Sequence, residues 1–171
     1  MTADELKALQ APIKTGYREN PDSAVHVMVA KGRISSDLTC RLETPAGEVD
    51  AGLHPAAGGS GEWACSGDML LQSLIACAGV TFSAVATAME IPVTEATVRA
   101  EGELDFRGTL GVSKEAQIGF RNIQMTFDVE SPASEEKIAK LVQLTERYCV
   151  IFQTLQNPPP IEVKTELSSA E

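Results

Sequence analysis

One long uncharged run, from Met69 to Met89, limits the folds open to this chain more than any other feature. It is long enough to cross a membrane. However, the amide residue Gln72 and hydroxyl residues such as Ser73 dilute it, and acidic residues flank it instead of Lys or Arg. Apolar and small residues occupy every face, which predicts a helix buried on all sides. A single 171-residue domain has difficulty enclosing a helix of about 34 Å. The run therefore predicts a core helix that a second subunit helps to bury.

Composition narrows the class of protein further. The length suits one domain, and 14 basic against 24 acidic residues give a net charge of −10. Such a surface repels phosphate backbones and anionic lipid, so we expect no nucleic-acid and no membrane partner. The 4 cysteines are too few for a disulfide-stapled secreted scaffold. The first residues, MTADELKALQ, lack the features of a signal peptide, so we expect a cytoplasmic protein.

The order of local patterns predicts an α+β fold with antiparallel sheet and a single domain over 24–171, preceded by an N-terminal extension over 1–23. In the extension, a short helix over 4–10 is expected to end at Pro12. Strands are predicted over 24–34, 38–43, 93–107, 120–131 and 161–167, with a loop over 51–67. Pro92 ends the long helix, and a second helix begins at Ser131 or Ser134 and runs to about Tyr148. A further helical turn is expected over 149–157.

The cysteines carry the strongest chemical signal. Their spacing contains no CxxC, and His26 and His54 do not stand at metal-ligand spacing, so a zinc site is not expected. Cys77 lies halfway along the uncharged run, where a free cysteine is most often a small buried hydrophobe. Small side chains on the same stripe leave room for a ligand or another backbone. Cys149 follows the second helix, where the helix end disfavours a thiolate and Arg147 favours one.

Two segments together resemble the OsmC/Ohr family, the osmotically induced and organic-hydroperoxide-resistance proteins. The first is DMLLQSLIACAG, similar to the family's LLLAALGxC, and the second is ERYCVIFQTL, similar to AxxCPVSxxL. The residues that fit are Asp68, Leu70, Leu71, Leu74, Cys77, Tyr148, Cys149, Ile151, Thr154 and Leu155. The resemblance covers residues 24–168, and the order of strands and helices also fits.

This resemblance implies an intertwined homodimer in which antiparallel sheets wrap long buried central helices. It also implies a two-cysteine thiol peroxidase acting on organic hydroperoxides. Cys77 would then be the peroxidatic thiolate, which becomes a sulfenic acid, and Cys149 would resolve it as a disulfide. An external dithiol would reduce that disulfide, and no cofactor is implied.

The chain departs from the family pattern where the thiolate is activated. The family's glutamate, ten residues before the first cysteine, is replaced by Gly67, and Asp68 is the nearest acid. Nine residues of helix turn about 900°, so Asp68 would face away from Cys77 and is equally suited to capping the helix. Arg33 is our first choice for the activating cation, and Arg41 and His54 are the alternatives.

A second departure is Val150, which replaces the usual proline after the second cysteine. The predicted site is therefore Cys77, Cys149, Asp68 and Arg33. Two other functions stay open: an OsmC-like module binding a small apolar or electrophilic molecule, and a cysteine hydrolase or acyltransferase pairing Cys77 or Cys65 with His54. The roles of Cys65 and Cys40 are also open.

Overall fold

A computed structural model describes residues 1–168, and its central element is the helix α2, Ser66–Ala88. The predicted helix is therefore confirmed, with Asp68 in its first turn and Met89 as its C-cap. By length and composition alone α2 could cross a membrane, a property that core helices of soluble proteins share. Only one face of α2 is buried within the chain, through Leu74, Ala78, Phe82 and Ala86. The expected burial on all sides is thus not met by one chain.

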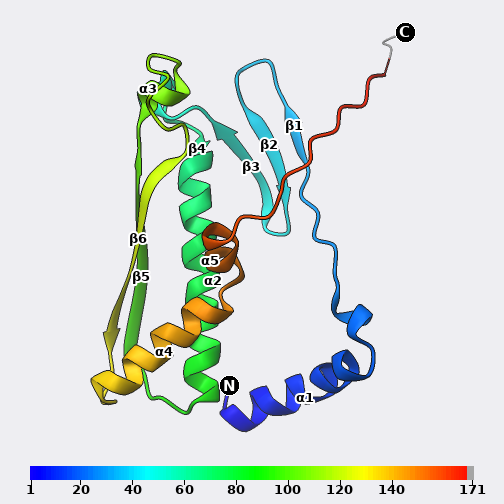
Figure 1. Cartoon of the computed structure of the whole chain (residues 1–171), viewed down its shortest axis with the longest axis vertical. Helices are drawn as coiled ribbons and strands as arrows, with labels where there is room; N and C mark the ends of the chain where they lie inside the picture. The colour runs from blue at the N-terminus through cyan, green and yellow to red at the C-terminus, as the bar shows by residue number, and fades with distance from the viewer. Residues whose placement is uncertain (169–171) are drawn as a thin grey trace.

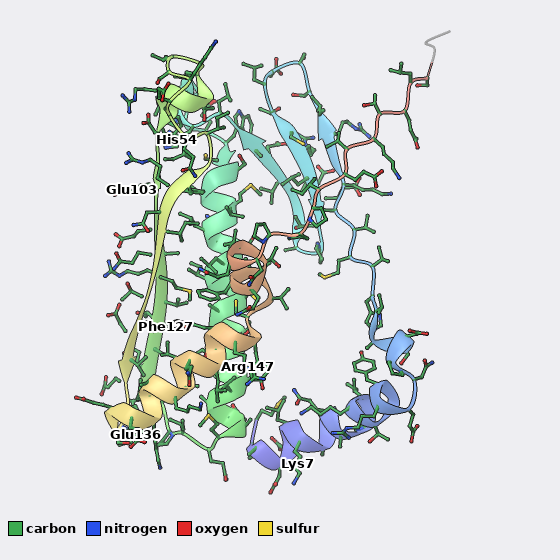
Figure 2. All side chains as sticks on the ribbon, viewed as in Figure 1. Lys7, His54, Glu103, Phe127, Glu136 and Arg147 are labelled. Atoms are coloured by element: carbon green, nitrogen blue, oxygen red, sulfur yellow. The ribbon has the colours of Figure 1, made fainter. Side chains whose placement is uncertain are left out.

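A long hairpin covers the buried face of α2 (Figure 1). Its strands are β5, Glu95–Leu104, and β6, Phe120–Glu130, paired antiparallel along their length. The rings of Phe127 on β6 and Phe82 on α2 stack with centroids 5.3 Å apart, and the Phe127 side chain points from the sheet towards the helix (Figure 2). The outer face carries ion pairs such as Arg99 with Asp128. This confirms the half-solvated antiparallel strand predicted from the alternation of apolar and charged residues.

A second sheet lies beside the N-terminal half of α2 (Figure 1). Its four strands follow the order β1, Gly32–Ile34, β2, Cys40–Thr44, β3, Gly47–Gly52, and β4, Ala64–Cys65. All pairs are antiparallel except the short pair β3 and β4, which is parallel. The predicted loop over 51–67 was wrong in part, because it contains the end of β3, the 3₁₀ helix η2, Pro55–Ala57, and β4.

Of the predicted strands, one is much shorter in the described chain and one is absent from it. The strand expected over 24–34 is restricted to β1, and no strand forms over 161–167. Both segments are extended, and their apolar side chains are exposed, with Val27 at 88 % and Ile161 at 88 %. Apolar alternation is typical of a strand, but a strand also needs a neighbour for its backbone hydrogen bonds. Within the described chain, only the end of the first segment finds that neighbour, where β1 pairs with β2.

Two helices near the C-terminus, α4 and α5, also pack against α2. Helix α4, Glu135–Tyr148, begins at the N-cap Ser134, one of the two predicted starts, and is followed by α5, Val150–Gln156. Leu141 of α4 is fully buried and joins Phe82, Ala86 and Ile91 in the core. A short helix, α3, Phe106–Thr109, lies in the loop between β5 and β6.

The N-terminal extension forms a longer helix than predicted. Helix α1 spans Ala3–Glu19, and the 3₁₀ helix η1, Pro21–Ala24, follows it. The expectation that Pro12 ends this helix was wrong, because Pro12 lies inside it. The capping box between Thr2 and Glu5 secures the N-terminus. No residue of α1 is buried, in keeping with an extension outside the core. Residues 169–171 of the predicted domain lie outside the described residues.

Candidate functional site

Cys77 and Cys149 meet where α2, α4 and α5 converge. On α4, Leu141 and Thr145 are fully buried, and the same four-residue spacing leads to Cys149, which is 0 % exposed. This periodicity turns Cys149 towards α2, where Cys77 lies beside the buried face of the helix. The two thiols lie within hydrogen-bonding reach of each other. The pair suggested by the sequence is therefore brought together by helix packing.

The chain bends sharply at Cys149, and this bend aims backbone N–H groups at Cys77. Cys149 has an extended conformation (φ −73°, ψ 109°), so it ends α4 and serves as the N-cap of α5. Its Sγ accepts a hydrogen bond from the N–H of Phe152 at 3.5 Å. The first N–H groups of a helix have no partner within it. Those of Val150 and Ile151 lie within hydrogen-bonding reach of the Cys77 sulfur.

The surroundings of Cys77 favour its thiolate. Burial alone would raise the pKa of Cys77, since it disfavours the charged form. Hydrogen bonding from the N–H of Ile151, the thiol of Cys149, the N–H of Val150 and the hydroxyl of Thr81 outweighs burial, so the pKa of Cys77 is lowered. No arginine contributes to this shift within the described chain. The sequence suggested a cation for this role, and the described groups that lower the pKa of Cys77 include two backbone N–H groups.

The surroundings of Cys149 favour its protonated thiol. Burial raises the pKa of Cys149, and the neighbouring Cys77 raises it further, because a thiolate at Cys77 accepts a hydrogen bond from the Cys149 thiol and repels a second negative charge. The N–H of Phe152 opposes this only in part. The two cysteines therefore divide their roles: Cys77 is disposed to ionise, and Cys149 is disposed to keep its proton. A nucleophilic thiolate beside a protonated thiol is the arrangement that sulfenic acid formation and condensation require.

Asp68 and Arg33 lie away from the cysteine pair. Asp68 is exposed in the first turn of α2, where a carboxylate interacts favourably with the helix dipole. Arg33 is exposed on β1, opposite Arg41 in register. Neither Asp68 nor Arg33 is among the groups that shift the pKa of Cys77. Their predicted roles in the site stay predictions.

Arg41 and His54, the alternatives to Arg33 for activating Cys77, make contacts with other residues. Arg41 donates to both carboxylate oxygens of Asp50, at 2.8 and 2.9 Å, and this pairing raises the pKa of Arg41. His54 accepts a hydrogen bond from the N–H of Ala56 through Nδ1 and stacks on Phe106 at 4.8 Å. It lies near α3, at the opposite end of the molecule from α4, whereas α5 lies beside the middle of α2 (Figures 1 and 2). This position gives no support to a catalytic pair of Cys77 and His54.

The other cysteines have local surroundings of their own. Cys40 lies on β2, and Cys65 forms β4 and the N-cap of α2. Among residues 1–168, no group of three His, Cys, Asp or Glu side chains gathers as metal ligands. The donors missed by the sequence reasoning are Thr81 and the N–H groups of Val150 and Ile151. A signal for one of them was present, since valine at 150 keeps an N–H that proline lacks.

The fold and this site define an α+β protein with a thiol pair between its core helix α2 and the junction of α4 and α5. The sequence pattern of the family described as OsmC-like protein matches residues 59–164, more than half of the chain. The chain therefore belongs to the OsmC family. No curated protein matches it.

Solved structures show the same fold at low identity. An OsmC-like protein from Mycoplasma pneumoniae is 18 % identical, with 78 % of this chain and 89 % of that chain covered and a TM-score of 0.66. An organic hydroperoxide resistance protein from Legionella pneumophila is 16 % identical, with coverage of 78 % and 91 % and a TM-score of 0.61. Another, from Elizabethkingia anophelis, is 12 % identical, with coverage of 78 % and 91 % and a TM-score of 0.62. These likenesses confirm the predicted OsmC-like fold.

Proposed function

We propose that this protein is a two-cysteine thiol peroxidase that reduces organic hydroperoxides through Cys77 and Cys149. The observation that carries the proposal is the contact between a cysteine of lowered pKa and a buried cysteine of raised pKa. The names of the structurally similar hydroperoxide resistance proteins support the substrate class. An external dithiol as reductant, the absence of a cofactor and a cytoplasmic location belong to the same proposal.

In the proposed reaction, the Cys77 thiolate attacks the terminal oxygen of the hydroperoxide. The O–O bond breaks, the alkoxide leaves and takes up a proton as the alcohol, and Cys77 becomes a sulfenic acid. The Cys149 thiol then attacks the Cys77 sulfur and displaces the hydroxyl, which leaves as water. Two electrons pass from the thiols to the peroxide, and a Cys77–Cys149 disulfide remains.

The groups around the cysteine pair have separate roles in this reaction. The N–H groups of Val150 and Ile151 hold the thiolate in place before the attack. The apolar side chain of Val150, which is 67 % exposed beside the pair, offers contact to an alkyl group on the peroxide. This contact favours bulky apolar hydroperoxides over hydrogen peroxide.

Disulfide mapping after peroxide treatment tests this function. One equivalent of cumene hydroperoxide is expected to link Cys77 to Cys149 and to leave Cys40 and Cys65 free, as read by alkylation and peptide mass mapping. Hydrogen peroxide in the same assay is expected to react more slowly. Four persistent thiols would contradict the peroxidase and favour the binding module, and a Cys65–Cys77 disulfide would overturn the pairing.

We also propose that the protein is a homodimer. An exposed stripe of α2 contains no charged residue and consists of Gln72, Ser73, Ala76, Val80 and Ser83. Small residues of this kind permit close helix packing. The segments 25–31 and 161–167, which follow extended paths (Figure 1), add exposed apolar side chains. A second copy would cover this surface and supply the missing strand neighbours.

Sedimentation at micromolar concentration tests the assembly. We expect a species of about 36 kDa, twice the chain mass of 18.2 kDa, that dissociates only as it unfolds. A well-folded species at the mass of one chain would contradict the dimer.

A further inference from the structure

Helix α1 carries an apolar stripe along one side. Four apolar side chains recur every three or four residues and lie within roughly 80° of the helix circumference: Leu6, Leu9, Ile13 and Tyr17. The charged side chains of α1 all lie outside this sector. Leu9 is 59 % exposed and Ile13 51 % exposed, although a surface helix normally turns such a stripe towards a core. Within the described chain, no side chain of α1 is buried.

The sequence of α1 is a weak helix former by itself. Pro12 removes a backbone hydrogen bond, and Gly16 lowers the helix propensity further. Isolated helices of about 12–15 residues are marginal in water even without such residues. The 17 residues of α1 exceed that length only slightly, and the capping box secures only the first turn. Most helical stability in proteins comes from packing an amphipathic face, so the stripe needs a surface that its own chain does not supply.

Both ends of α1 adjoin surfaces that the proposed homodimer covers. At the start, residues 1–3 line one groove together with Ser83 of the uncharged α2 stripe. At the end, the Tyr17 hydroxyl lies 3.2 Å from Nε2 of His26, which joins the helix to the segment 25–31. Between these ends, α1 lies apart from both sheets and from α4 and α5 (Figure 1). The stripe is therefore continuous with the surface assigned to a second copy.

Charge favours a second copy over a lipid surface as the partner of α1. Residues 1–31 contain equal numbers of acidic and basic side chains, whereas the whole chain has a net charge of −10. A helix that binds a membrane surface has a polar face rich in Lys and Arg, which α1 lacks, and the acidic remainder of the chain repels anionic lipid. A neutral segment meets no net repulsion from an acidic second copy.

We propose that the apolar stripe of α1 packs against a second copy of this chain, so that residues 1–31 form an N-terminal arm on the other subunit. The contact presupposes the homodimer proposed above and adds a docking surface to it. Helix α1 lies outside residues 59–164, which match the family pattern, so the arm is an addition to the shared domain. In a two-fold dimer the contact forms twice, once through each arm.

Photo-crosslinking in the full-length protein tests the contact. Benzoylphenylalanine replaces Ile13 in one variant and Thr15, on the opposite side of α1, in the control. Irradiation is expected to link two chains covalently in the first variant and to leave the chains of the control unlinked. The linked species is identified by its mass, and its attachment site by peptide mapping.

The outcomes separate the arm from the dimer. A dimer in sedimentation whose position 13 links only within its own chain, or links to nothing, would overturn the arm and leave the homodimer standing. Equal linking from positions 13 and 15 would also overturn the docking of the stripe. A folded species at the mass of one chain would remove both proposals.

Matched substitutions measure the contribution of the stripe to stability. Ile13→Asp and Thr15→Asp place the same residue two positions apart in α1, so their effects on helix propensity are alike. At one fixed protein concentration, Ile13→Asp is expected to lower the thermal unfolding midpoint by about 5 °C or more, because it puts a charge into an apolar contact. Thr15→Asp is expected to change the midpoint by less than about 2 °C. Equal midpoints for the two variants would contradict the docking of the stripe.

Discussion

Cys77→Ser is expected to reduce dithiol-dependent turnover of organic hydroperoxide to the rate seen without protein. A serine hydroxyl at this position is not ionised near neutral pH, so the N–H groups of Val150 and Ile151 have no anion to stabilise. Serine is close to cysteine in size, and Cys77 is only partly buried, so the fold is expected to survive. Peroxide consumption with excess dithiothreitol measures the effect, and circular dichroism verifies the fold.

Cys149→Ser is the matched variant, because it removes the resolving thiol and keeps the attacking one. Serine is a good N-cap residue, so α5 keeps the cap that Cys149 now provides. The variant is expected to consume about one equivalent of peroxide per chain and then to stop, with a sulfenic acid that a dimedone-type reagent can trap on Cys77. Turnover that survives Cys77→Ser, or that is unchanged in Cys149→Ser, would contradict the assigned roles.

Val150→Pro is expected to raise the pKa of Cys77, because proline removes one of the two backbone N–H groups aimed at its sulfur. Proline is well tolerated at the first position of a helix. Cys149 already has the extended conformation that a residue before proline prefers. A hydrogen bond to a charged group contributes about 1.5 kcal/mol. The thiolate fraction below the titration midpoint should therefore fall about tenfold.

Val150→Ala is the control for this substitution, because it removes the exposed side chain and keeps the N–H. It is expected to titrate like the unsubstituted protein, and the thermal stability of both variants shows whether α5 is preserved. The same titration midpoint in Val150→Pro as in Val150→Ala would show that this N–H does not stabilise the thiolate.

The sequence predicted the core helix, the start of α4 and the cysteine pair through different kinds of information. The helix and its uncharged faces follow from composition alone, and Ser134 is recognisable as an N-cap. The pairing of Cys77 with Cys149 came from the family resemblance. Local periodicity could not provide it, because the contact depends on how α4 packs on α2.

The misses have a common physical origin in partners that local sequence does not show. Segments 25–31 and 161–167 alternate like strands, but a strand is completed by hydrogen bonds to a neighbour that one chain does not supply. Pro12 was expected to end α1, yet the turns on both sides tolerate the loss of one backbone hydrogen bond.

The sequence predicts that a side chain such as Arg33 lowers the pKa of Cys77. The described groups that lower it include the backbone N–H groups of Val150 and Ile151. Backbone donors have no residue signature, so a search among side chains could not find them. The one sequence feature that indicates such a donor is Val150, which keeps a backbone N–H where the family pattern has proline.

The pH dependence of Cys77 alkylation in the unsubstituted, reduced protein tests the central claim most directly. Iodoacetamide labelling of the Cys77 peptide is measured by mass spectrometry over a range of pH, with the Cys149 peptide as an internal reference. The account predicts that the midpoint for Cys77 lies below that of a free cysteine, about 8.5, and that Cys149 labels only at higher pH. A Cys77 midpoint at or above the free-cysteine value, or a Cys149 midpoint below that of Cys77, would contradict it.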